Sequence, residues 1–244
     1  MTQAVLAAHG LRKSYGSLVV TEGVSLAAFA GEALGIIGPN GAGKTTLFHL
    51  LGGSVAPDAG RVELGGADVS REPPARRCLR GLARTHQIPR PFGDLTVFEN
   101  ALVGAEFGRG RSGAGAGERA MAALRRAGIA ELADRPGRTL GLVARKRLEL
   151  ARALAAEPVV LLLDEVAGGL TTAEMAELCV VLDEIRKAGV ALVWIEHGVT
   201  QLAGFVDRLL ALDRGRVVAI GAPAEVLADP AVQLTYLGVG AVAS

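Results

Sequence analysis

The fold is decided by one stretch of sequence, Ala33-Leu34-Gly35-Ile36-Ile37-Gly38-Pro39-Asn40-Gly41-Ala42-Gly43-Lys44-Thr45-Thr46-Leu47-Phe48-His49-Leu50-Leu51. Its first five residues are typical of a buried strand, and residues 45–51 are typical of a helix. Between them, residues 38–45 follow the pattern Gly-x-x-x-x-Gly-Lys-Thr. Glycines at these places let backbone N–H groups turn toward phosphate oxygens, and the helix adds its positive N-terminal end. The strand–loop–helix order therefore predicts a phosphate-binding loop.

This phosphate loop, residues 38–45, predicts that the chain binds ATP together with Mg²⁺. Lys44 would contact the β- and γ-phosphates, the Thr45 hydroxyl would ligate Mg²⁺, and Thr46 would add a phosphate contact. A purely structural glycine turn is the alternative, and it does not account for the whole pattern in this context. The predicted nucleotide-binding residues of the loop are Gly38, Pro39, Asn40, Gly41, Ala42, Gly43, Lys44, Thr45 and Thr46.

A second apolar strand ends in two acids, in the order Leu161-Leu162-Leu163-Asp164-Glu165. Ligands of open α/β sheets bind beyond the carboxyl ends of the strands. We expect Asp164 to hold Mg²⁺, often through water, and Glu165 to orient or deprotonate the attacking water. Two acids after a strand are also common at solvated strand ends, so this assignment depends on the presence of the phosphate loop.

The overall composition limits the class of protein. The chain has 244 residues, of which 50% are hydrophobic, and a net charge of +1. This length suffices for one sizeable core and a smaller lobe, and the mixed charge gives no argument for nucleic acid or an anionic membrane surface. Cys78 and Cys179 lie far apart without metal-ligand spacing, which favours a reduced cytosolic chain. We expect no signal peptide, and no apolar run approaches the roughly 18 residues needed to span a bilayer.

The order of the predicted elements indicates a parallel sheet with an inserted helical lobe. Strands are expected at residues 5–8, 24–28, 33–37, 61–64, 159–163, 190–195, 209–212 and 216–220, with a turn at residues 213–215 between the last two. Helices are expected at residues 45–51, 95–103, 118–127, 144–155, 172–187 and near 199–205. The segment from Gly104 to Gly117 is rich in glycine and arginine, so we expect it to be a mobile loop.

Along nearly its whole length the chain resembles the nucleotide-binding subunits of ABC transporters, and it is most similar to the ATPases of branched-chain amino-acid importers. The resemblance rests on residues 34–48, on Ala83-Arg84-Thr85-His86-Gln87 through Leu95-Thr96-Val97-Phe98-Glu99-Asn100, and on the tail from Asp229 to Gly238. It implies a single ABC ATPase domain, an α/β P-loop NTPase fold with a mainly parallel core sheet. The core would comprise about residues 1–88 and 157–244, with an N-terminal antiparallel β subdomain, and a helical subdomain would span about residues 89–156.

The resemblance assigns roles to three further residues. Tyr15 matches the aromatic side chain that stacks on adenine, although an ordinary turn tyrosine is the alternative. Gln87 matches the glutamine that senses the γ-phosphate and Mg²⁺, and His197 matches the histidine that contacts the γ-phosphate. The implied catalytic residues are Glu165, His197 and Gln87, and the implied metal-binding residues are Thr45, Gln87 and Asp164. The other histidines, His9, His49 and His86, are interpreted as structural or surface residues.

The sequence departs from the family at the signature loop, which in relatives reads Leu-Ser-Gly-Gly-Gln and contacts the ATP of a partner subunit. Here the matching residues are Leu140, Gly141, Leu142, Val143 and Ala144. Gly141 replaces the serine hydroxyl, and the branched Val143 replaces a glycine that lets the backbone approach phosphate. A shifted alignment would place Gly141 in the glycine slot but lengthen the spacing to the helix. Three further departures lie outside the signature loop. Val166 replaces the proline that usually follows the two acids, Asp164 and Glu165. Residues 168–171 lack the aspartate often found there, and Gly198 follows His197 where relatives commonly have an acid.

These departures predict a heterodimer with a second ABC ATPase chain, in preference to a homodimer. The expected role is to power an importer of branched-chain amino acids or a related small polar solute. Besides the second ATPase, the chain would have two membrane permease subunits as partners and, indirectly, an extracytoplasmic solute-binding protein. No nucleic acid is expected among its partners. The chain would act at the cytoplasmic face of the cell membrane, as a peripheral subunit. The alternatives are an export ATPase, such as a lipopolysaccharide transport ATPase, and a weakly hydrolysing regulatory subunit.

Overall fold

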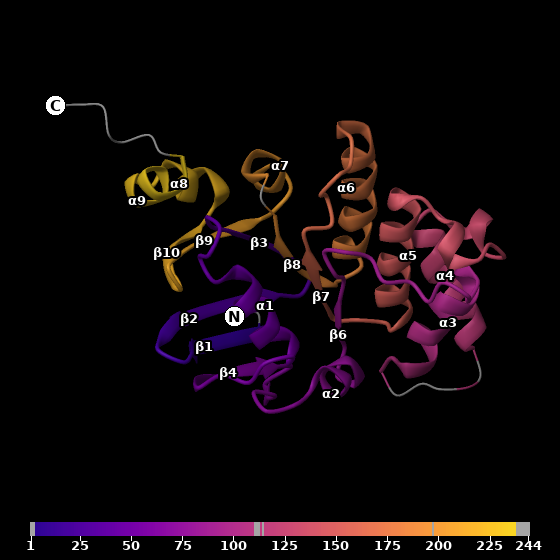
Figure 1. Cartoon of the computed structure of the whole chain (residues 1–244), viewed down its shortest axis with the longest axis horizontal. Coiled ribbons are helices and arrows are strands. Elements are labelled where there is room, and N and C mark those ends of the chain that lie inside the picture. The colour runs from indigo at the N-terminus through magenta and orange to yellow at the C-terminus, as the bar shows by residue number, and fades with distance from the viewer. Residues whose placement is uncertain (1–2, 110–112, 114, 197, 238–244) are drawn as a thin grey trace.

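The computed structural model describes residues 3–109, 113, 115–196 and 198–237. The prediction for His197 therefore lies outside the described residues. Within them the chain forms two sheets with helices around them, and three of the helices gather at one end of the molecule (Figure 1).

The larger sheet is the predicted core. Its six strands lie in the order β10-β9-β3-β8-β7-β6, and every pair in it is parallel except β9 with β10. The strands are β3 (Ala33–Ile37), β6 (Leu82–Arg84), β7 (Val160–Asp164), β8 (Ala191–Ile195), β9 (Arg208–Asp213) and β10 (Arg216–Gly221). Every residue of β3, β7 and β8 is buried, since both faces of the sheet are covered. Such strands read as continuous apolar runs, which is why they could be predicted.

The smaller sheet is antiparallel and lies beside the core, in the order β2-β1-β4-β5. Its strands are β1 (Ala4–Tyr15), β2 (Leu18–Phe29), β4 (Ala59–Leu64) and β5 (Ala67–Asp68). Its buried face joins α1 and the core sheet in one hydrophobic cluster that includes Leu6, Val24, Phe48 and Val62. The strands β1 and β2 are longer than the predicted runs because their outward residues are polar.

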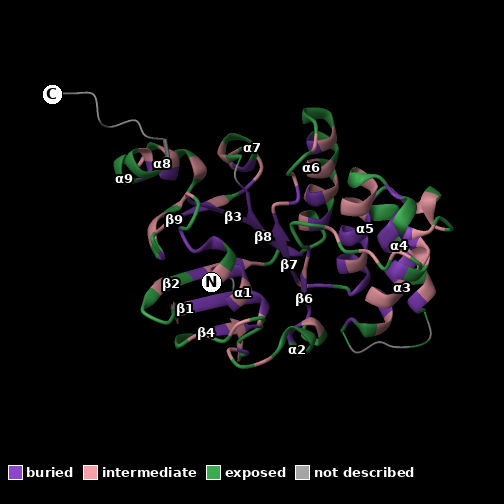
Figure 2. Ribbon diagram, viewed as in Figure 1, coloured by how far each residue is buried: buried purple, intermediate pink, exposed green. Residues whose placement is uncertain are grey.

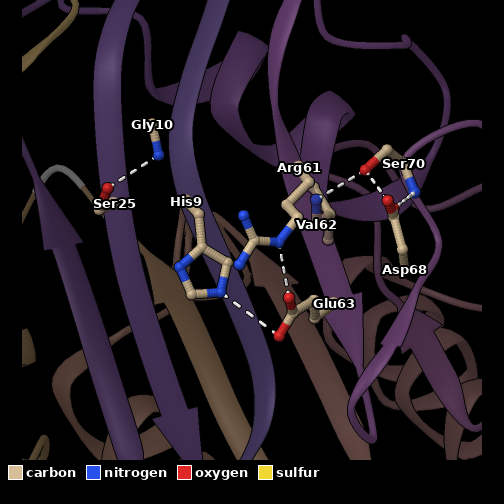
Figure 3. A network of polar contacts seen from close by, with 8 residues as sticks. All are labelled: His9, Gly10, Ser25, Arg61, Val62, Glu63, Asp68 and Ser70. Carbon is tan, nitrogen blue, oxygen red and sulfur yellow. Dashed lines mark hydrogen bonds and ion pairs between the residues drawn. The ribbon is translucent and has the colours of Figure 1, made fainter.

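Polar side chains cover part of this antiparallel sheet (Figure 3). Glu63 on β4 accepts a hydrogen bond from Arg61 at 2.7 Å and lies 3.4 Å from His9 Nε2 on β1. Ser25 accepts a hydrogen bond from the Gly10 N–H at 2.8 Å across β1 and β2. Exposed pairs of this kind contribute little to stability, and they place His9 on the surface of the sheet.

The helices cover the core sheet and form the end lobe (Figure 2). They are α1 (Lys44–Gly52), α2 (Pro74–Leu79), α3 (Val97–Phe107), α4 (Ala116–Arg126), α5 (Leu142–Ala155), α6 (Thr172–Lys187), α7 (Val199–Ala203), α8 (Pro223–Ala228) and α9 (Pro230–Val232). Short 3₁₀ turns lie at Ala130–Leu132 and Gly137–Thr139, and a π turn lies at Gln233–Leu237. Helices α3, α4 and α5 pack on one another through small buried residues such as Ala101, Ala120 and Ala151. In the part of the chain that the structure describes, no helix is long and apolar enough to cross a membrane.

The predicted loop from Gly104 to Gly117 is too long. The helix α3 continues through Phe107, and α4 already begins at Ala116. The reason is packing, because Ala105 and Ala116 are almost fully buried. A side chain at Gly104 would also lie 2.2 Å from the Arg152 carbonyl oxygen. Gly104 therefore allows two helices to pack closely. Glycine content alone cannot distinguish this role from the role of glycine in a flexible loop.

Candidate functional site

The phosphate loop runs from β3 into α1 as predicted. Gly41 and Gly43 have φ angles of 80° and 100°, a region that side chains other than glycine rarely adopt. A side chain at Gly43 would lie 2.5 Å from the Val20 carbonyl oxygen, whereas no atom lies within 4 Å of such a side chain at Gly41. The loop is thus packed against the protein on one side and has space on the other.

The predicted phosphate ligand Lys44 lies inside this loop. Its Nζ donates to the carbonyl oxygens of Gly38 at 2.6 Å and Pro39 at 3.1 Å. Burial lowers the pKa of Lys44 below its ordinary value, while the charge of Glu165 opposes that shift. The ammonium group is therefore placed among carbonyl oxygens where an anion would stabilise it strongly.

The phosphate loop and Glu165 share one pocket at the carboxyl edge of the core sheet. The pocket has a volume of about 260 Å³ and is lined by Val20, Asn40, Gly41, Ala42, Gly43, Lys44, Thr45, Thr46 and Glu165. Glu165 lies more than 100 positions after the phosphate loop in the sequence, and the parallel pairing of β3, β8 and β7 brings the two together. This pocket is the candidate nucleotide site.

Gln87 reaches Glu165 directly. Its side-chain amide donates to Glu165 Oε2, so the residue predicted to sense the γ-phosphate contacts the residue predicted to orient the attacking water. Glu165 has a φ angle of 49°, which is unusual for a residue other than glycine. This backbone conformation directs the residue after β7 away from the extended path of the strand.

The loop at residues 165–168 is held from two sides. Lys146 on α5 donates to the carbonyl oxygens of Val166 at 2.8 Å and Gly168 at 2.5 Å. Glu196, which follows β8, accepts a hydrogen bond from the Ala167 N–H at 2.7 Å and another from Trp194 Nε1 at 3.1 Å. Burial raises the pKa of the Glu196 carboxyl group. The backbone that carries Glu165 is therefore strongly constrained.

Asp164 has a partner that sequence reasoning missed. Arg84 on β6 donates from Nη2 to Asp164 Oδ2 at 2.7 Å, and both side chains are largely buried. The two residues are separated by 80 positions, so neither periodicity nor motif spacing could have paired them. The only available signal was position, because Arg84 comes three residues before Gln87.

The three residues predicted to hold Mg²⁺ are of types that suit this ion. Thr45 supplies an exposed hydroxyl, and Asp164 supplies a carboxylate at the end of β7. Hydroxyl, carboxylate and amide oxygens are ligands that Mg²⁺ accepts together with phosphate oxygens and water. These residue types therefore suit the predicted metal, with Thr45, Asp164 and Gln87 as the residues that would hold it. Of the three, Thr45 lines the phosphate pocket, whereas Asp164 and Gln87 are not among the residues that line it, and the Asp164 carboxylate is paired with Arg84.

Tyr15 ends β1, and the residue is 49% exposed. Lys13 Nζ lies 5.8 Å from the ring centroid. Tyr15 is not among the residues that line the phosphate pocket. An exposed aromatic face is available at this place, and stacking on adenine stays a prediction.

The signature residues begin α5. Leu140 is buried, Gly141 is the N-cap residue without a side-chain hydrogen bond, and α5 starts at Leu142, two residues before the predicted start. Val143 lines a small apolar pocket with Leu163 and other residues of β7, α5 and α6. It therefore packs within its own chain, as a branched apolar side chain in a first helical turn would.

The parallel sheet, the glycine loop that opens α1 and the paired acids after β7 define a P-loop nucleotide-binding protein. Residues 21–168 match the family model described as ABC transporter, and the chain belongs to this family. It is an ATP-hydrolysing subunit of a transporter.

Curated relatives match almost the full length. The chain is 33% identical to the lipopolysaccharide export system ATP-binding protein LptB of Haemophilus influenzae over 235 residues, covering 96% of this chain and 98% of that protein. It is 34% identical to the high-affinity branched-chain amino acid transport ATP-binding protein LivG of Salmonella typhimurium, covering 98% and 99%. Among solved structures, the ADP conformation of the ATP-binding cassette MJ1267 has a TM-score of 0.87 at 28% identity, covering 97% of this chain and all of that one.

Proposed function

We propose that this chain powers an importer for branched-chain amino acids or a related small polar solute. The observation that carries the catalytic part is the pocket in which Glu165 faces Lys44, Thr45 and Thr46. The full-length similarity to LivG supports the transport part. LptB is about equally similar, so lipopolysaccharide-type export is the second candidate.

In the proposed mechanism, ATP phosphates accept hydrogen bonds from the backbone of the phosphate loop, and Lys44 neutralises charge on the β- and γ-phosphates. Mg²⁺, held by Thr45, Asp164 and Gln87, would supply further charge neutralisation on the phosphate oxygens. Glu165 orients a water molecule and accepts its proton, while Gln87 fixes the Glu165 carboxylate through its amide. Catalysis then depends on positioning and electrostatics, as in phosphoryl transfer generally. Tyr15 would stack on the base, and His197 would contact the γ-phosphate.

A groove between the core sheet and the end lobe is the proposed contact for a membrane permease subunit. It has a volume of about 410 Å³ and is lined by residues of β6, α3 and α5, including Phe107, Glu149 and Arg152. Phe107, in the lining of this groove, is 73% exposed. Ile88, outside the lining but two residues after His86, which belongs to it, is 69% exposed. Large apolar side chains exposed at a groove mark protein contacts. The chain would therefore sit at the cytoplasmic face of the membrane as a peripheral subunit, with a solute-binding protein acting outside.

The proposed dimer pairs this chain with a second ABC ATPase. Its phosphate loop, Asp164 and Glu165 follow the family pattern, whereas Gly141 and Val143 depart from it. In a homodimer both ATP sites would use the altered signature. In a heterodimer the phosphate loop of this chain would face the signature of the partner, and one site would be complete. A weakly hydrolysing regulatory subunit remains the alternative for the altered signature.

The transport proposal is tested by purifying the tagged chain from membranes of its native cells and reconstituting the complex in vesicles. We expect a second ATPase chain and two permeases to co-purify, and the complex to move labelled leucine inward in an ATP-dependent way. The Lys44→Ala variant is the matched control for ATP dependence. Co-purification with components that bind lipopolysaccharide, and no amino-acid uptake, would support export instead.

A further inference from the structure

Three side chains of α5 point to loops outside the end lobe. Lys146, Glu149 and Arg152 follow one another at three-residue spacing and so lie along one side of the helix. Each of them makes hydrogen bonds to backbone groups far away in the sequence. No local sequence pattern marks any of the three, because their partners are 19 or more positions distant.

Glu149 and Arg152 hold the turn at residues 86–90. Glu149 Oε1 accepts a hydrogen bond from the His86 N–H at 2.7 Å, and Arg152 Nη1 donates to the Arg90 carbonyl oxygen at 2.9 Å. Gln87 lies between these two anchored positions and donates its side-chain amide to Glu165. The place of Gln87 therefore depends on contacts with α5.

Lys146 holds the second catalytic segment. Its three acceptors are the carbonyl oxygens of Glu165 at 3.5 Å, Val166 at 2.8 Å and Gly168 at 2.5 Å. One ammonium group thus satisfies several carbonyl oxygens in the 165–168 loop, which carries Glu165. A single helix contacts both segments that meet at the Gln87–Glu165 hydrogen bond.

Burying a carboxylate at position 149 costs free energy unless hydrogen bonds or opposite charges compensate for the lost hydration. Glu149 is only 7% exposed, and its second oxygen, Oε2, is buried without a hydrogen-bond partner. A leucine of similar size would fill this place without that cost. Its distinctive contribution to the structure is therefore its contact with the backbone of the 86–90 turn, chiefly the hydrogen bond that Oε1 accepts from the His86 N–H.

We propose that Glu149 and Lys146 are positioning residues for ATP hydrolysis, with Glu149 fixing the place of Gln87 and Lys146 fixing the place of Glu165. This proposal rests on the roles proposed above for Gln87 and Glu165. Neither positioning residue lines the nucleotide pocket, and both act through the backbone of the segment that they hold. The common helix α5 keeps the two segments in register with each other.

The surroundings of Glu149 add a pH dependence to this arrangement. Burial raises the pKa of its carboxyl group to about 7, and the arginines and backbone donors around it oppose the shift only in part. The charged and titratable groups near it are Lys146 and Arg152 on α5, Arg84 on β6, and His86 and Arg90 in the 86–90 turn. Hydrogen bonds to an ionised carboxylate are about twice as strong as those to a neutral group. Glu149 should therefore hold the 86–90 turn more firmly above pH 7 than below it.

The test measures hydrogen–deuterium exchange and single-turnover hydrolysis of MgATP on the purified full-length chain. In Glu149→Leu we expect the amide exchange of residues 86–90 to rise about tenfold, the effect of one lost hydrogen bond. The rate of hydrolysis should fall about 10- to 100-fold, because small displacements of positioned groups have effects of this size. The concentration of ATP that gives half the maximal rate should change less than about twofold, since the phosphate loop is untouched.

Conservative variants separate positioning from general loss of stability. Glu149→Gln keeps an oxygen that can accept from the His86 N–H, so at pH 8 it should stay within about threefold of the parent rate. The parent chain should change its rate of hydrolysis near pH 7 as Glu149 ionises, and the Glu149→Gln variant should lack that change. Glu149→Asp keeps the charge but is too short to reach, so it should resemble Glu149→Leu. This pair remains informative even when the leucine variant does not fold.

Lys146→Met is the matching test for the second segment. It should raise exchange in residues 165–168 while leaving residues 86–90 unchanged, and it should lower the rate without weakening ATP binding. Arg147→Met is the control, because Arg147 lies on the same helix but pairs with Glu177 on α6.

The positioning proposal is wrong if Glu149→Leu or Glu149→Asp leaves the exchange of residues 86–90 at the parent level. It is also wrong if Arg147→Met reproduces the effects of both variants. Failure of the proposed catalytic roles would look different. The Glu165→Gln chain would then hydrolyse ATP at the parent rate, whatever the exchange of the two segments shows.

Discussion

Glu165 combines a left-handed backbone conformation with a side chain directed at the phosphate loop. A residue other than glycine in this conformation carries a cost of about 1–3 kcal/mol. The contacts that hold it in place are the Lys146 hydrogen bonds to the 165–168 loop and the Glu196 hydrogen bond to Ala167. The strain lies at the position where the sequence predicts catalytic chemistry, and it supports the proposed role of Glu165 in catalysis.

Replacing Glu165 by glutamine should abolish most hydrolysis while preserving nucleotide binding. The amide cannot accept a proton from water, and loss of a general base typically lowers rates by about 10² to 10⁴. The measurement is single-turnover release of phosphate together with equilibrium binding of MgATP. Glu184→Gln, an exposed change on α6, is the matched control. Equal rates for the two variants would contradict the assignment.

Glu149 makes the stability of the chain depend on pH. Its pKa is raised from 4.5 to about 7 in the folded chain, so the folded state keeps this proton in a range where the unfolded state has lost it. The associated stability is fully present below about pH 4.5 and is lost as the pH rises through 7. The shift corresponds to about 3 kcal/mol at most.

Glu149→Gln removes this titration. We expect the unfolding free energy of the variant, relative to the parent chain, to rise between pH 5 and pH 8 by an amount that approaches this limit. Urea unfolding at the two pH values is the measurement. A difference that does not change with pH would show that burial does not raise this pKa.

At the scale of single elements, the first turn of α5 is the informative place. Gly141 caps this helix with φ of −71° and ψ of 173°, and no atom lies within 4 Å of where a side chain would begin. Helices α3 and α6, by contrast, use Thr96 with Glu99 and Thr171 with Glu174 in reciprocal capping boxes. The helix that bears the signature therefore begins without the side-chain cap that these two have.

Gly141→Ser should stabilise the chain by a few tenths of a kcal/mol, because the hydroxyl can accept from an N–H in the first turn at no steric cost. The check is the midpoint of urea unfolding for the variant and the parent chain. Gly141→Ala is the matched control, since it adds the same carbon atom without the hydroxyl. An equal gain in the alanine variant would show that the cap is not responsible.

Elements that carry their own periodicity could be predicted from the sequence, and those defined by distant partners could not. The strands β3, β7 and β8 are apolar runs bounded by turns, and all three were expected. The strand β6 has only three residues and depends on pairing with β7, so it was missed. The helix α2, which begins with Pro74, was missed as well.

The same contrast applies to the site. The phosphate loop and the acids after β7 are local motifs, and the structure brings the loop and Glu165 into one pocket. Arg84 and Glu149 act through partners 80 and 63 positions away. No local pattern marks such residues, because their significance arises only when the sheet and the end lobe pack together.

At the scale of the whole molecule, the altered signature decides how copies can cooperate. The proposed heterodimer predicts weak steady-state hydrolysis by the lone chain and at least about tenfold more when its partner ATPase is added, since loss of one positioned donor to phosphate has effects of that order. The measurement is ATPase activity across mixing ratios with constant total protein. Fast cooperative hydrolysis by the lone chain would contradict the heterodimer.

Restoring the family pattern tests the same idea from this chain alone. The double variant Gly141→Ser with Val143→Gly should hydrolyse ATP faster than the parent chain when no partner is present. Val143→Gly alone is the control, since it adds backbone freedom without the hydroxyl donor. The glycine also lowers helix stability by a few tenths of a kcal/mol or more, so unfolding is measured alongside. No gain in rate would show that the altered signature does not limit the homodimer.

Trp194 is the one tryptophan of the sequence, and its position gives the chain an optical reporter. The indole is fully buried and donates a hydrogen bond to Glu196. It packs edge-on against Phe205, with 5.4 Å between the two ring centroids. The same Glu196 oxygen accepts the Ala167 N–H of the loop that carries Glu165. Movement of that loop should therefore change the electric field at the indole and shift its emission. Stopped-flow fluorescence of the unlabelled protein can then follow the catalytic loop in real time.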